Sequence, residues 1–423
     1  MSTHEIIHFA MIAVFVIGYL LITIEHLVKV NKATIALMTG ILLWVLQFGD
    51  QVADPTTNLA IFSEHLAGIA QVVLFLLGAL SVVEIINQHK GFQILTEMFA
   101  IRSKRVFLVT VAIVTFALSS VLDNLTTTII MVTFLSKLLG KTEDRLLIGG
   151  AVVIAANAGG AWTPIGDVTT TMLWIGGQLS TFEIMRDLVI PSVVCASVST
   201  LILTLPLKGK FNLKPAPKTH MEPFGYWVFW LGIAALIFVP IFKVVTGLPP
   251  FMGIFFGLSF LWIVTDLAHH HDERTHLRVP HVMTKIDLSA ALFFLGILLA
   301  IDALEAAGIL KTLALFLDRT VGHPEWIAFA IGIASAVVDN VPLVAAAMSM
   351  YDMTQFPIDD NFWKLVAYCA GTGGSVLIIG SASGVIYMGL EKVSFFWYIK
   401  RISLAALIGY AAGAFLFMAL NQF

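Results

Sequence analysis

The chain has 423 residues and a net charge of −3 at pH 7; 58% of its residues are hydrophobic and only 12% are charged. A soluble globular protein has about a quarter of its residues charged, so this composition excludes that class, and the small net charge gives no reason to expect nucleic-acid binding. Apolar runs of about 20 residues recur along the chain, which predicts an all-α polytopic membrane protein. Residues 1–8 carry no basic residue ahead of the first apolar run, so we expect the first helix to be retained rather than cleaved as a signal peptide.

The first half of the chain, residues 1–207, is predicted to cross the membrane five times and to form one helical hairpin. The continuous spans are residues 6–24, 33–48, 66–86 and 188–207, and a span broken near its middle covers residues 146–175. The hairpin covers residues 105–139. As one helix it would be about 52 Å long at 1.5 Å per residue, whereas the hydrocarbon core of a bilayer is about 30 Å thick. We therefore expect the chain to turn back at Asp123.

A cytoplasmic linker, residues 208–223, contains four Lys and three Pro residues and leads to the second half, residues 224–423. The continuous spans of this half are predicted at residues 224–242, 251–267, 288–303 and 402–420. A second hairpin covers residues 325–353 and turns at Asp339, and a second broken span covers residues 362–390. The two halves are therefore predicted to contain the same elements in the same order.

The two predicted hairpin turns carry related sequences, SSVLDNLTTT at residues 119–128 and SAVVDNVP at residues 335–342. Asp123 and Asp339 are 216 residues apart, about half the chain, and Gly159-Gly160 is matched by Gly373-Gly374 at nearly the same spacing. This regularity predicts one duplicated unit. Because each unit crosses the membrane an odd number of times, the second copy is expected to be inverted, as in many secondary transporters.

The distribution of basic residues predicts the orientation of the chain. With the N-terminus outside, 19 of the 24 Lys and Arg residues fall on the cytoplasmic side and five fall outside. Basic residues concentrate on the cytoplasmic side of membrane proteins. The tally therefore predicts that both termini lie outside, and that the two hairpins enter the membrane from opposite faces.

An ionisable residue at membrane depth costs about 2.5 kcal/mol or more, and this chain places one in each hairpin turn. The simplest interpretation is that Asp123 and Asp339 only cap half-helices, but Ser or Thr would do so without burying a charge. Together with the broken spans at residues 157–167 and 371–384, they would supply oxygen ligands suited to a small cation. The predicted ion-binding and proton-coupling residues are Asp123, Asn124, Thr126, Thr127, Thr128, Asn157, Thr163, Asp167, Asp339, Asn340, Ser381 and Ser383. Those expected to bind Na⁺ are Asp123, Asn124, Asn157 and Asp167.

The predicted site is asymmetric between the halves. Asp167 in the first broken span has no acidic counterpart, and the second broken span offers Ser381 and Ser383. The first half is therefore expected to be specialised for binding, with Asp339 serving charge balance or proton coupling. Asp167 could also merely cap the half-helix that follows it.

Other features have simpler interpretations. Glu84 and Asp302 fall near span ends and are expected to be interfacial, and residues 269–271, three consecutive histidines, are expected to form part of a solvated loop. The glycine pairs could be close helix-packing contacts. Cys195 and Cys369 lie in apolar runs and are interpreted as small buried hydrophobic residues. No nucleotide-binding loop is present, so no ATP drive is expected.

In residues 119–128, 157–170 and 338–343 the chain resembles the NhaD family of sodium/proton antiporters, within the ion transporter superfamily, and the layout of spans extends the resemblance over the whole chain. The third segment is shared more loosely with relatives that include arsenite permeases. The resemblance implies exchange of cytoplasmic Na⁺ or Li⁺ for external H⁺ without ATP, an elevator-like movement, and a dimer in a bacterial inner membrane. No cofactor is implied, and the expected partners are membrane lipid, the transported cations and a second copy of the chain.

The alternatives are a sodium-coupled anion (dicarboxylate) symporter, an arsenite-type permease, a channel of the same fold, and an intramembrane enzyme that uses paired Asp. Dicarboxylate symporters of the superfamily carry Ser-Asn-Thr at the hairpin tips, where this chain has Asp123-Asn124 and Asp339-Asn340. This departure argues against a dicarboxylate substrate. The duplicated layout argues against an enzyme.

Overall fold

The computed structural model describes residues 3–23, 28–49, 55–98, 101, 103–140, 142–211, 221–269 and 277–421. Residues 212–220 of the predicted linker and residues 270 and 271 of the histidine run lie outside this set. Nearly all the described residues are helical, and the only β pairing among them is the isolated bridge between Ser103 and Lys210. Eight of the described helices are long and apolar enough to cross a membrane. The predicted all-α polytopic membrane protein is confirmed.

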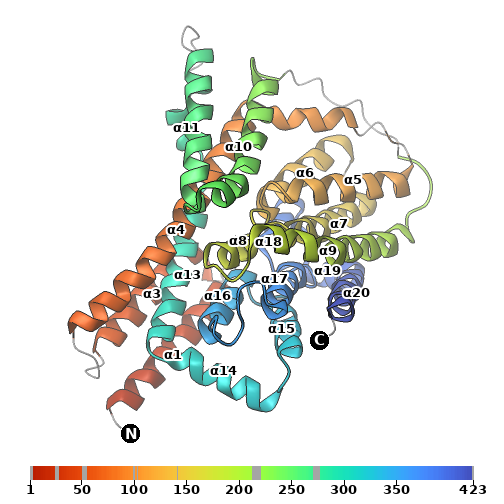
Figure 1. Ribbon diagram of the computed structural model, residues 1–423. Coiled ribbons are helices and arrows are strands. Elements are labelled where there is room, and N and C mark those ends of the chain that lie inside the picture. The colour runs from red at the N-terminus through yellow and green to blue at the C-terminus, as the bar shows by residue number, and fades with distance from the viewer. Residues whose placement is uncertain are drawn as a thin grey trace.

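The helices form two bodies, each with its own apolar core, and each body takes helices from both halves of the sequence (Figure 1). The first body is built from α1 (Thr3–Thr23), α3 (Lys32–Gly49), α4 (Pro55–Gln88), α10 (Gly225–Thr246), α11 (Pro250–Ala268), α12 (Val279–Met283) and α13 (Leu288–Ala306). The short helix η1 (Gly91–Met98) follows α4, and α14 (Ile309–Thr320) follows α13. Figure 1 shows α1, α3, α4, α11 and α13 on the left and α14 along the lower edge of the molecule.

The second body holds the interrupted elements and lies on the right in Figure 1. Its helices from the first half are α5 (Lys104–Ser119), α6 (Asn124–Leu138), α7 (Glu143–Gly160), α8 (Val168–Ile175) and α9 (Thr181–Thr204). Those from the second half are α15 (Pro324–Ala334), α16 (Asn340–Met350), α17 (Asn361–Gly373), α18 (Ala382–Glu391), α19 (Phe395–Tyr398), η3 (Ile399–Ser403) and α20 (Leu404–Leu420). Helices α8, α14 and α16 each contribute side chains to both cores, so they take part in the contact between the bodies.

Hydrogen bonds between buried aromatic residues and main-chain oxygens hold the second body together. The Tyr368 hydroxyl donates to the Tyr410 carbonyl oxygen at 3.0 Å, and the Tyr410 hydroxyl donates to the Phe329 carbonyl oxygen at 2.7 Å. A buried ion pair at 2.5 Å joins Arg145 near the start of α7 to Glu391 at the end of α18. Buried polar groups with good partners favour one packing arrangement over its alternatives. These contacts therefore position α15, α17 and α20 relative to one another, and α7 relative to α18.

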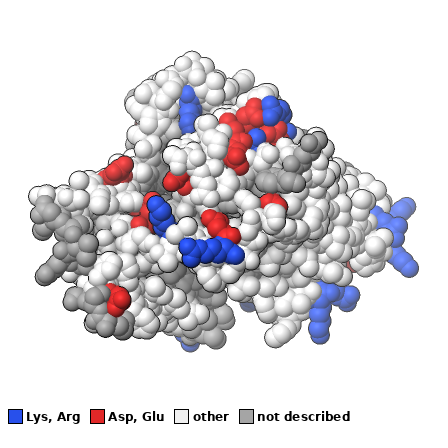
Figure 2. Space-filling view, turned by 60° about the horizontal axis from the view of Figure 1, so that its bottom comes forward, with Lys and Arg blue, Asp and Glu red and all other residues white. Residues whose placement is uncertain are grey.

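The outer surface is strongly apolar. Phe9, Val245, Leu267 and Phe396 are each at least 68% exposed. The face in Figure 2 shows broad areas without charged side chains, between which acidic and basic groups gather in small clusters. Apolar surface on this scale is unfavourable in water, and it fits contact with lipid tails.

The four interruptions occur near the predicted places. The chain turns at residues 120–123 between α5 and α6, which contact each other, and at residues 335–339 between α15 and α16, which also do so. Figure 1 shows α5 and α6 above the region of α8 and α18, and α15 and α16 below it. The inverted relation of the halves and their boundaries stay predictions.

The breaks are shorter than predicted. Residues 157–160 belong to α7, and the Ala161 amide donates to the Asn157 carbonyl oxygen at 3.1 Å. Likewise α17 continues to Gly373, so the second break covers only residues 374–381. The prediction that the first break begins at residue 157 was therefore wrong, because glycine lets α7 approach the backbone of α5 while its helical hydrogen bonds continue.

Candidate functional site

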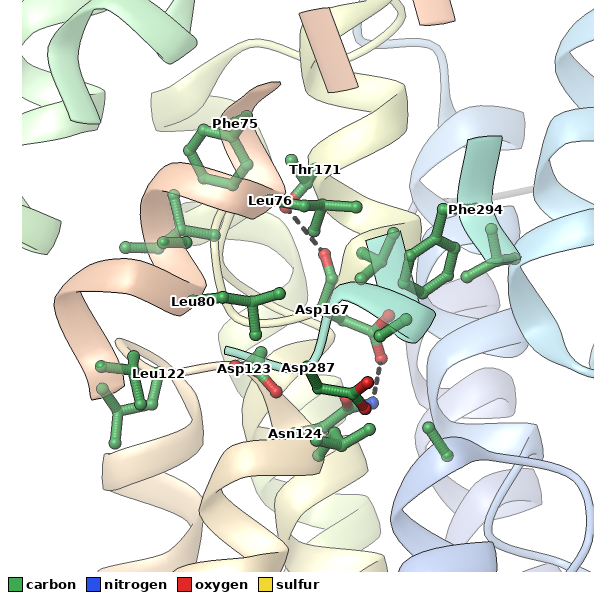
Figure 3. A pocket seen from close by; sticks show the side chains of 18 of the residues that line it. Phe75, Leu76, Leu80, Leu122, Asp123, Asn124, Asp167, Thr171, Asp287 and Phe294 are labelled. Atoms are coloured by element: carbon green, nitrogen blue, oxygen red, sulfur yellow. Dashed lines mark hydrogen bonds between the residues drawn. The ribbon is translucent and has the colours of Figure 1, made fainter. Parts of the chain in front are cut away.

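Four helix N-termini approach one another where the two bodies meet. The residues that precede these helices are Asp123 before α6, Asp167 before α8, Asp339 before α16 and Ser381 before α18. The three aspartates and Ala382 line a cavity of about 80 Å³ (Figure 3). Asp and Ser are preferred N-cap residues because their side-chain oxygens accept hydrogen bonds from free amides of the first turn. The sequence thus ends each interruption with a residue that can begin a new helix.

Asp123 both caps α6 and faces the cavity. Its Oδ1 accepts a hydrogen bond from the Thr126 amide at 2.7 Å, and its Oδ2 accepts one from the Thr126 hydroxyl at 2.6 Å. Each carboxylate oxygen can accept more than one bond, so capping leaves ligand capacity toward the cavity. Capping and ion binding are therefore compatible at this residue.

A buried chain of side-chain amides connects Asp167 to the other interruptions. The Asn124 amide group donates to Asp167 Oδ2 at 2.7 Å and to Asn157 Oδ1 at 3.0 Å. The Asn157 amide group in turn donates to the hydroxyls of Ser375 and Ser381, both at 2.9 Å. Four predicted residues, Asn124, Asn157, Asp167 and Ser381, are thus brought into one network. Ser375, which was not predicted, completes it.

Asp167 caps α8 with its other oxygen. Its Oδ1 accepts from the amide and the hydroxyl of Thr169, both at 2.9 Å, and the residue is only 2% exposed. All of its described hydrogen bonds come from neutral donors. The carboxylate is therefore held firmly in place without a positive partner among those contacts.

The cavity is negative on one side and apolar on the other. Asp123, Asp167, Asp287 and Asp339 are among its lining residues, and no Lys, Arg or His is. Figure 3 shows the facing wall, which includes Phe75, Leu76 and Leu80 of α4 and Phe294 of α13. Carboxylates in surroundings of low polarity need protons or a bound cation. The arrangement is suited to holding either.

Asp287 was not predicted as part of the site. It caps α13 by accepting a hydrogen bond from the Ser289 amide at 3.1 Å, and it is exposed. An acidic residue directly before an apolar span is the sequence signal for such a cap. That signal does not reveal which cavity the helix start borders.

Asp339 differs from Asp123 and Asp167 because it lies close to a basic side chain. Its Oδ2 lies 3.6 Å from the ammonium group of Lys32, which begins α3 in the first body. Lys32 also lies over the Phe293 ring at 4.3 Å. This lysine was not predicted as a site residue, because a Lys before an apolar span is typical of any cytoplasmic helix end. The role expected for Asp339, charge balance or proton coupling, stays a prediction.

Of the remaining predicted residues, Asn340 also lines the cavity, whereas Thr126, Thr127, Thr128, Thr163 and Ser383 lie outside its wall. The Thr128 hydroxyl donates to the Asn124 carbonyl oxygen and the Thr163 hydroxyl to the Ser120 carbonyl oxygen, both at 2.8 Å, so these two stabilise the local backbone. Among the described residues, three buried polar atoms near the site lack a hydrogen-bond partner: Thr127 Oγ1, Asn340 Nδ2 and Ser383 Oγ.

Comparisons with known proteins relate the chain to transporters. The family described as "Citrate transporter" matches residues 19–365. Two relatives from Arabidopsis thaliana, "Sodium/proton antiporter 1" and "Sodium/proton antiporter 2", are 51% and 48% identical over 98% of this chain, covering 72% and 100% of their own lengths. "Na(+)/H(+) antiporter NhaD" of Vibrio cholerae is 28% identical over 99% of this chain and 93% of its own length.

Proposed function

The chain belongs to the family of NhaD-type sodium/proton antiporters, and on that premise we propose that it exchanges cytoplasmic Na⁺ or Li⁺ for external H⁺. Its relatives are transporters, and the chain is a multi-pass membrane transporter rather than an enzyme. One observation carries the proposal: Asp123 and Asp167 line a cavity of about 80 Å³ that has no basic lining residue. The exchange contributes to pH and sodium homeostasis.

The proposed exchange is a competition for the same carboxylates. A carboxyl group away from water is stable either with a proton or with a cation bound to its ionised form. When Na⁺ arrives from one side, the protons leave, and when protons arrive from the other side, Na⁺ leaves. Asn124 links the two carboxylates. It is the first residue of α6, the helix that Asp123 caps, and its side chain donates a hydrogen bond to Asp167.

An elevator-like movement would carry the site across the membrane. Supporting it, the hairpins and broken helices share one apolar core, and α1, α3, α4, α10, α11 and α13 share another. The site lies on the group that contains the hairpins. On the other group it faces a wall that is apolar except for Asp287 at the start of α13. With Na⁺ or protons bound, the aspartates lose most of their net charge and can pass that wall. Unloaded, they cannot, and this difference couples the two ions.

A dicarboxylate symporter is the second candidate, and the match to the family described as "Citrate transporter" favours it. In that arrangement the free N-termini of half-helices would attract an anion. Here three of the four N-termini already carry an aspartate. An anionic substrate would meet these like charges at close range, so the cation is the better-supported cargo.

The test uses purified protein in proteoliposomes that contain a pH-sensitive dye and carry an imposed proton gradient. Addition of Na⁺ or Li⁺ should collapse the gradient, whereas K⁺ and dicarboxylates such as succinate should leave it unchanged. Proton movement driven by succinate, or movement that does not depend on Na⁺ or Li⁺, would overturn the proposal.

A membrane location and a homodimer are expected alongside this function, and co-purification in native membranes tests the dimer.

A further inference from the structure

A second cavity, of about 600 Å³, opens between α4 and α13 of the first body and α8 and α16 of the second. It is separate from the site described above, since the two have no lining residue in common. Its ionisable lining residues are Glu64, His65, Asp302 and Glu305, and no Lys or Arg lines it. A cavity with three carboxylates and no fixed positive charge attracts cations.

Three of these residues converge on one point. His65, Asp302 and Glu305 each offer a ligand atom, and these atoms all lie within 4.8 Å of one another. His65 Nδ1 and Asp302 Oδ2 are 3.3 Å apart. Two ligands on a tetrahedral zinc ion with bonds of about 2.0–2.1 Å would be about 3.3–3.4 Å apart. The observed separation therefore fits two ligands of one metal ion with little movement.

The packing of α4 against α13 places the three side chains close together. Asp302 and Glu305 are three residues apart on α13 and so lie on the same face of that helix. His65 comes from α4, which packs against α13. Its ring centroid lies 6.0 Å from that of buried Trp44, whose ring centroid is in turn 4.9 Å from that of Phe62. This aromatic contact restricts the imidazole, which lowers the entropy lost when it binds a metal.

We propose that His65, Asp302 and Glu305 form a binding site for a divalent transition-metal ion of the Zn²⁺ class. Imidazole and carboxylate ligands suit such ions, whereas Ca²⁺ and Mg²⁺ take oxygen ligands. Three protein ligands leave room for water as the fourth, and the cavity provides the space.

The bland interpretation of the same residues is a hydrogen-bonded His–Asp pair at the end of a membrane span. That interpretation accounts for His65 and Asp302. It leaves Glu305 with a hydrogen bond to Ser349 and places a third carboxylate beside the pair. A metal ion uses all three groups and neutralises the cavity. The site belongs to the first body, and it faces Met348 and Ser349 of α16 across the cavity, so it lies beside the surface between the two bodies.

The test is a titration of the purified, untagged full-length protein with Co²⁺, followed by visible absorption and then displacement by Zn²⁺. The wild type should show a saturable site. His65→Ala should abolish one equivalent of binding, and Glu305→Gln, which changes shape little, should weaken it by about tenfold or more. His323→Ala is the matched control. His323 also lies beside a carboxylate, Glu325 at 3.2 Å, but outside this cavity, and its variant should keep the full signal.

Two outcomes would overturn the site: no saturable Co²⁺ binding by the wild type, or undiminished binding by both His65→Ala and Glu305→Gln. Sodium/proton exchange is measured on the same preparations. Exchange without metal binding contradicts the metal site alone, and metal binding without exchange contradicts the antiport function alone.

Discussion

Aspartate serves two purposes at the interruptions of this chain. At Asp123 and Asp167 the side chain accepts hydrogen bonds from the first turn of a half-helix and also lines the central cavity. Ser381 shows that the capping part alone needs no charge, because it caps α18 in the corresponding place and accepts from Asn157. The negative charge of Asp123 and Asp167 is therefore not needed for capping, and we infer that it serves a function that a hydroxyl group cannot supply.

The two purposes of Asp167 can be separated with Asp167→Asn. Asn and Asp are comparable N-caps, so folding should survive, whereas loss of the charge should weaken the apparent Na⁺ affinity by about tenfold or more, equal to about 1.4 kcal/mol. The matched control is Asp360→Asn, since Asp360 caps α17 by accepting from the Phe362 amide at 2.8 Å and does not line the cavity. Apparent Na⁺ affinity is measured from concentration dependence in proteoliposomes. Equal affinities in the two variants would leave Asp167 with capping alone.

Some site residues could be predicted from their neighbours in the sequence, whereas others lie at the site only through contacts with distant parts of the chain. Asp123, Asn124, Asn157 and Asp167 stand out in the sequence because they are polar residues within apolar runs. Lys32 does not lie within an apolar run, so the sequence does not single it out. Only the tertiary structure places it beside Asp339, more than 300 residues away in the sequence. Sequence position carries no information about that approach.

Glycine at the interruptions permits close helix approach more than it unwinds the helix. A Cβ at Gly159 of α7 would clash with the Phe116 carbonyl oxygen of α5, and a Cβ at Gly373 of α17 would clash with the Gly332 carbonyl oxygen of α15. The paired glycines therefore hold each hairpin against its broken helix. The prediction that these glycines break the helices was only partly right. At Gly159 and Gly373 the alternative, close packing between helices, is what the structure shows.

Gly159→Ala is expected to destabilise the protein. The added methyl group meets main-chain atoms that cannot rotate away, and overpacking of this kind costs about 1–3 kcal/mol. The control is Gly389→Ala in α18, where a Cβ would meet nothing within 4 Å and where alanine favours the helix. Thermal unfolding of the detergent-solubilised variants is the measurement. A melting temperature of Gly159→Ala equal to that of the control would contradict the close approach.

Element boundaries were harder to predict where polar residues lie within helices. Helix α4 begins at Pro55, although the apolar span alone suggested residue 66. Asn58, Ser63, Glu64 and His65 lower the apolar character of its first part without breaking the helix. Hydropathy detects what lies in lipid, whereas helix ends depend on caps and on Pro. The missed part of α4 carries His65, and Asp302, predicted to be interfacial, lies in the same cavity.

Two apolar cores make up the part of the chain that the structure describes, and polar contacts cross between them. The ion pair between Lys32 and Asp339 is one of them, and it connects the start of α3 in the first body to the hairpin turn before α16 in the second. A movement of one body against the other must break this pair. Lys32 is therefore placed to compensate Asp339 in one state of the transporter.

A double-mutant cycle with Lys32→Gln and Asp339→Asn tests this link. Lys32→Gln leaves the Asp339 carboxylate without its partner and should slow exchange more than the double variant does, with a coupling energy of at least about 0.5 kcal/mol in thermal stability. Lys29→Gln, at an exposed position just before α3, is the control and should resemble the wild type. Additive effects of the two substitutions would mean that the pair contributes nothing.

The orientation predicted from the basic residues is tested by single cysteines at Lys208 and Met353. Both positions are exposed, and the native Cys195 and Cys369 are buried, so a membrane-impermeant thiol reagent should leave the native pair unlabelled. Lys208→Cys should react only from the cytoplasmic side and Met353→Cys only from the outer side. Reaction of both from one side would contradict the inverted arrangement of the two halves.

The central claim is that the Asp123 carboxylate takes part in the exchange of Na⁺ and H⁺. Asp123→Asn keeps the size and capping ability of the side chain but removes the charge and the exchangeable proton. We predict that reconstituted Asp123→Asn protein gives no Na⁺-driven proton movement at any pH, with thermal stability close to that of the wild type, and that Asp123→Glu retains partial activity. Robust Na⁺-driven proton movement by Asp123→Asn would contradict the account.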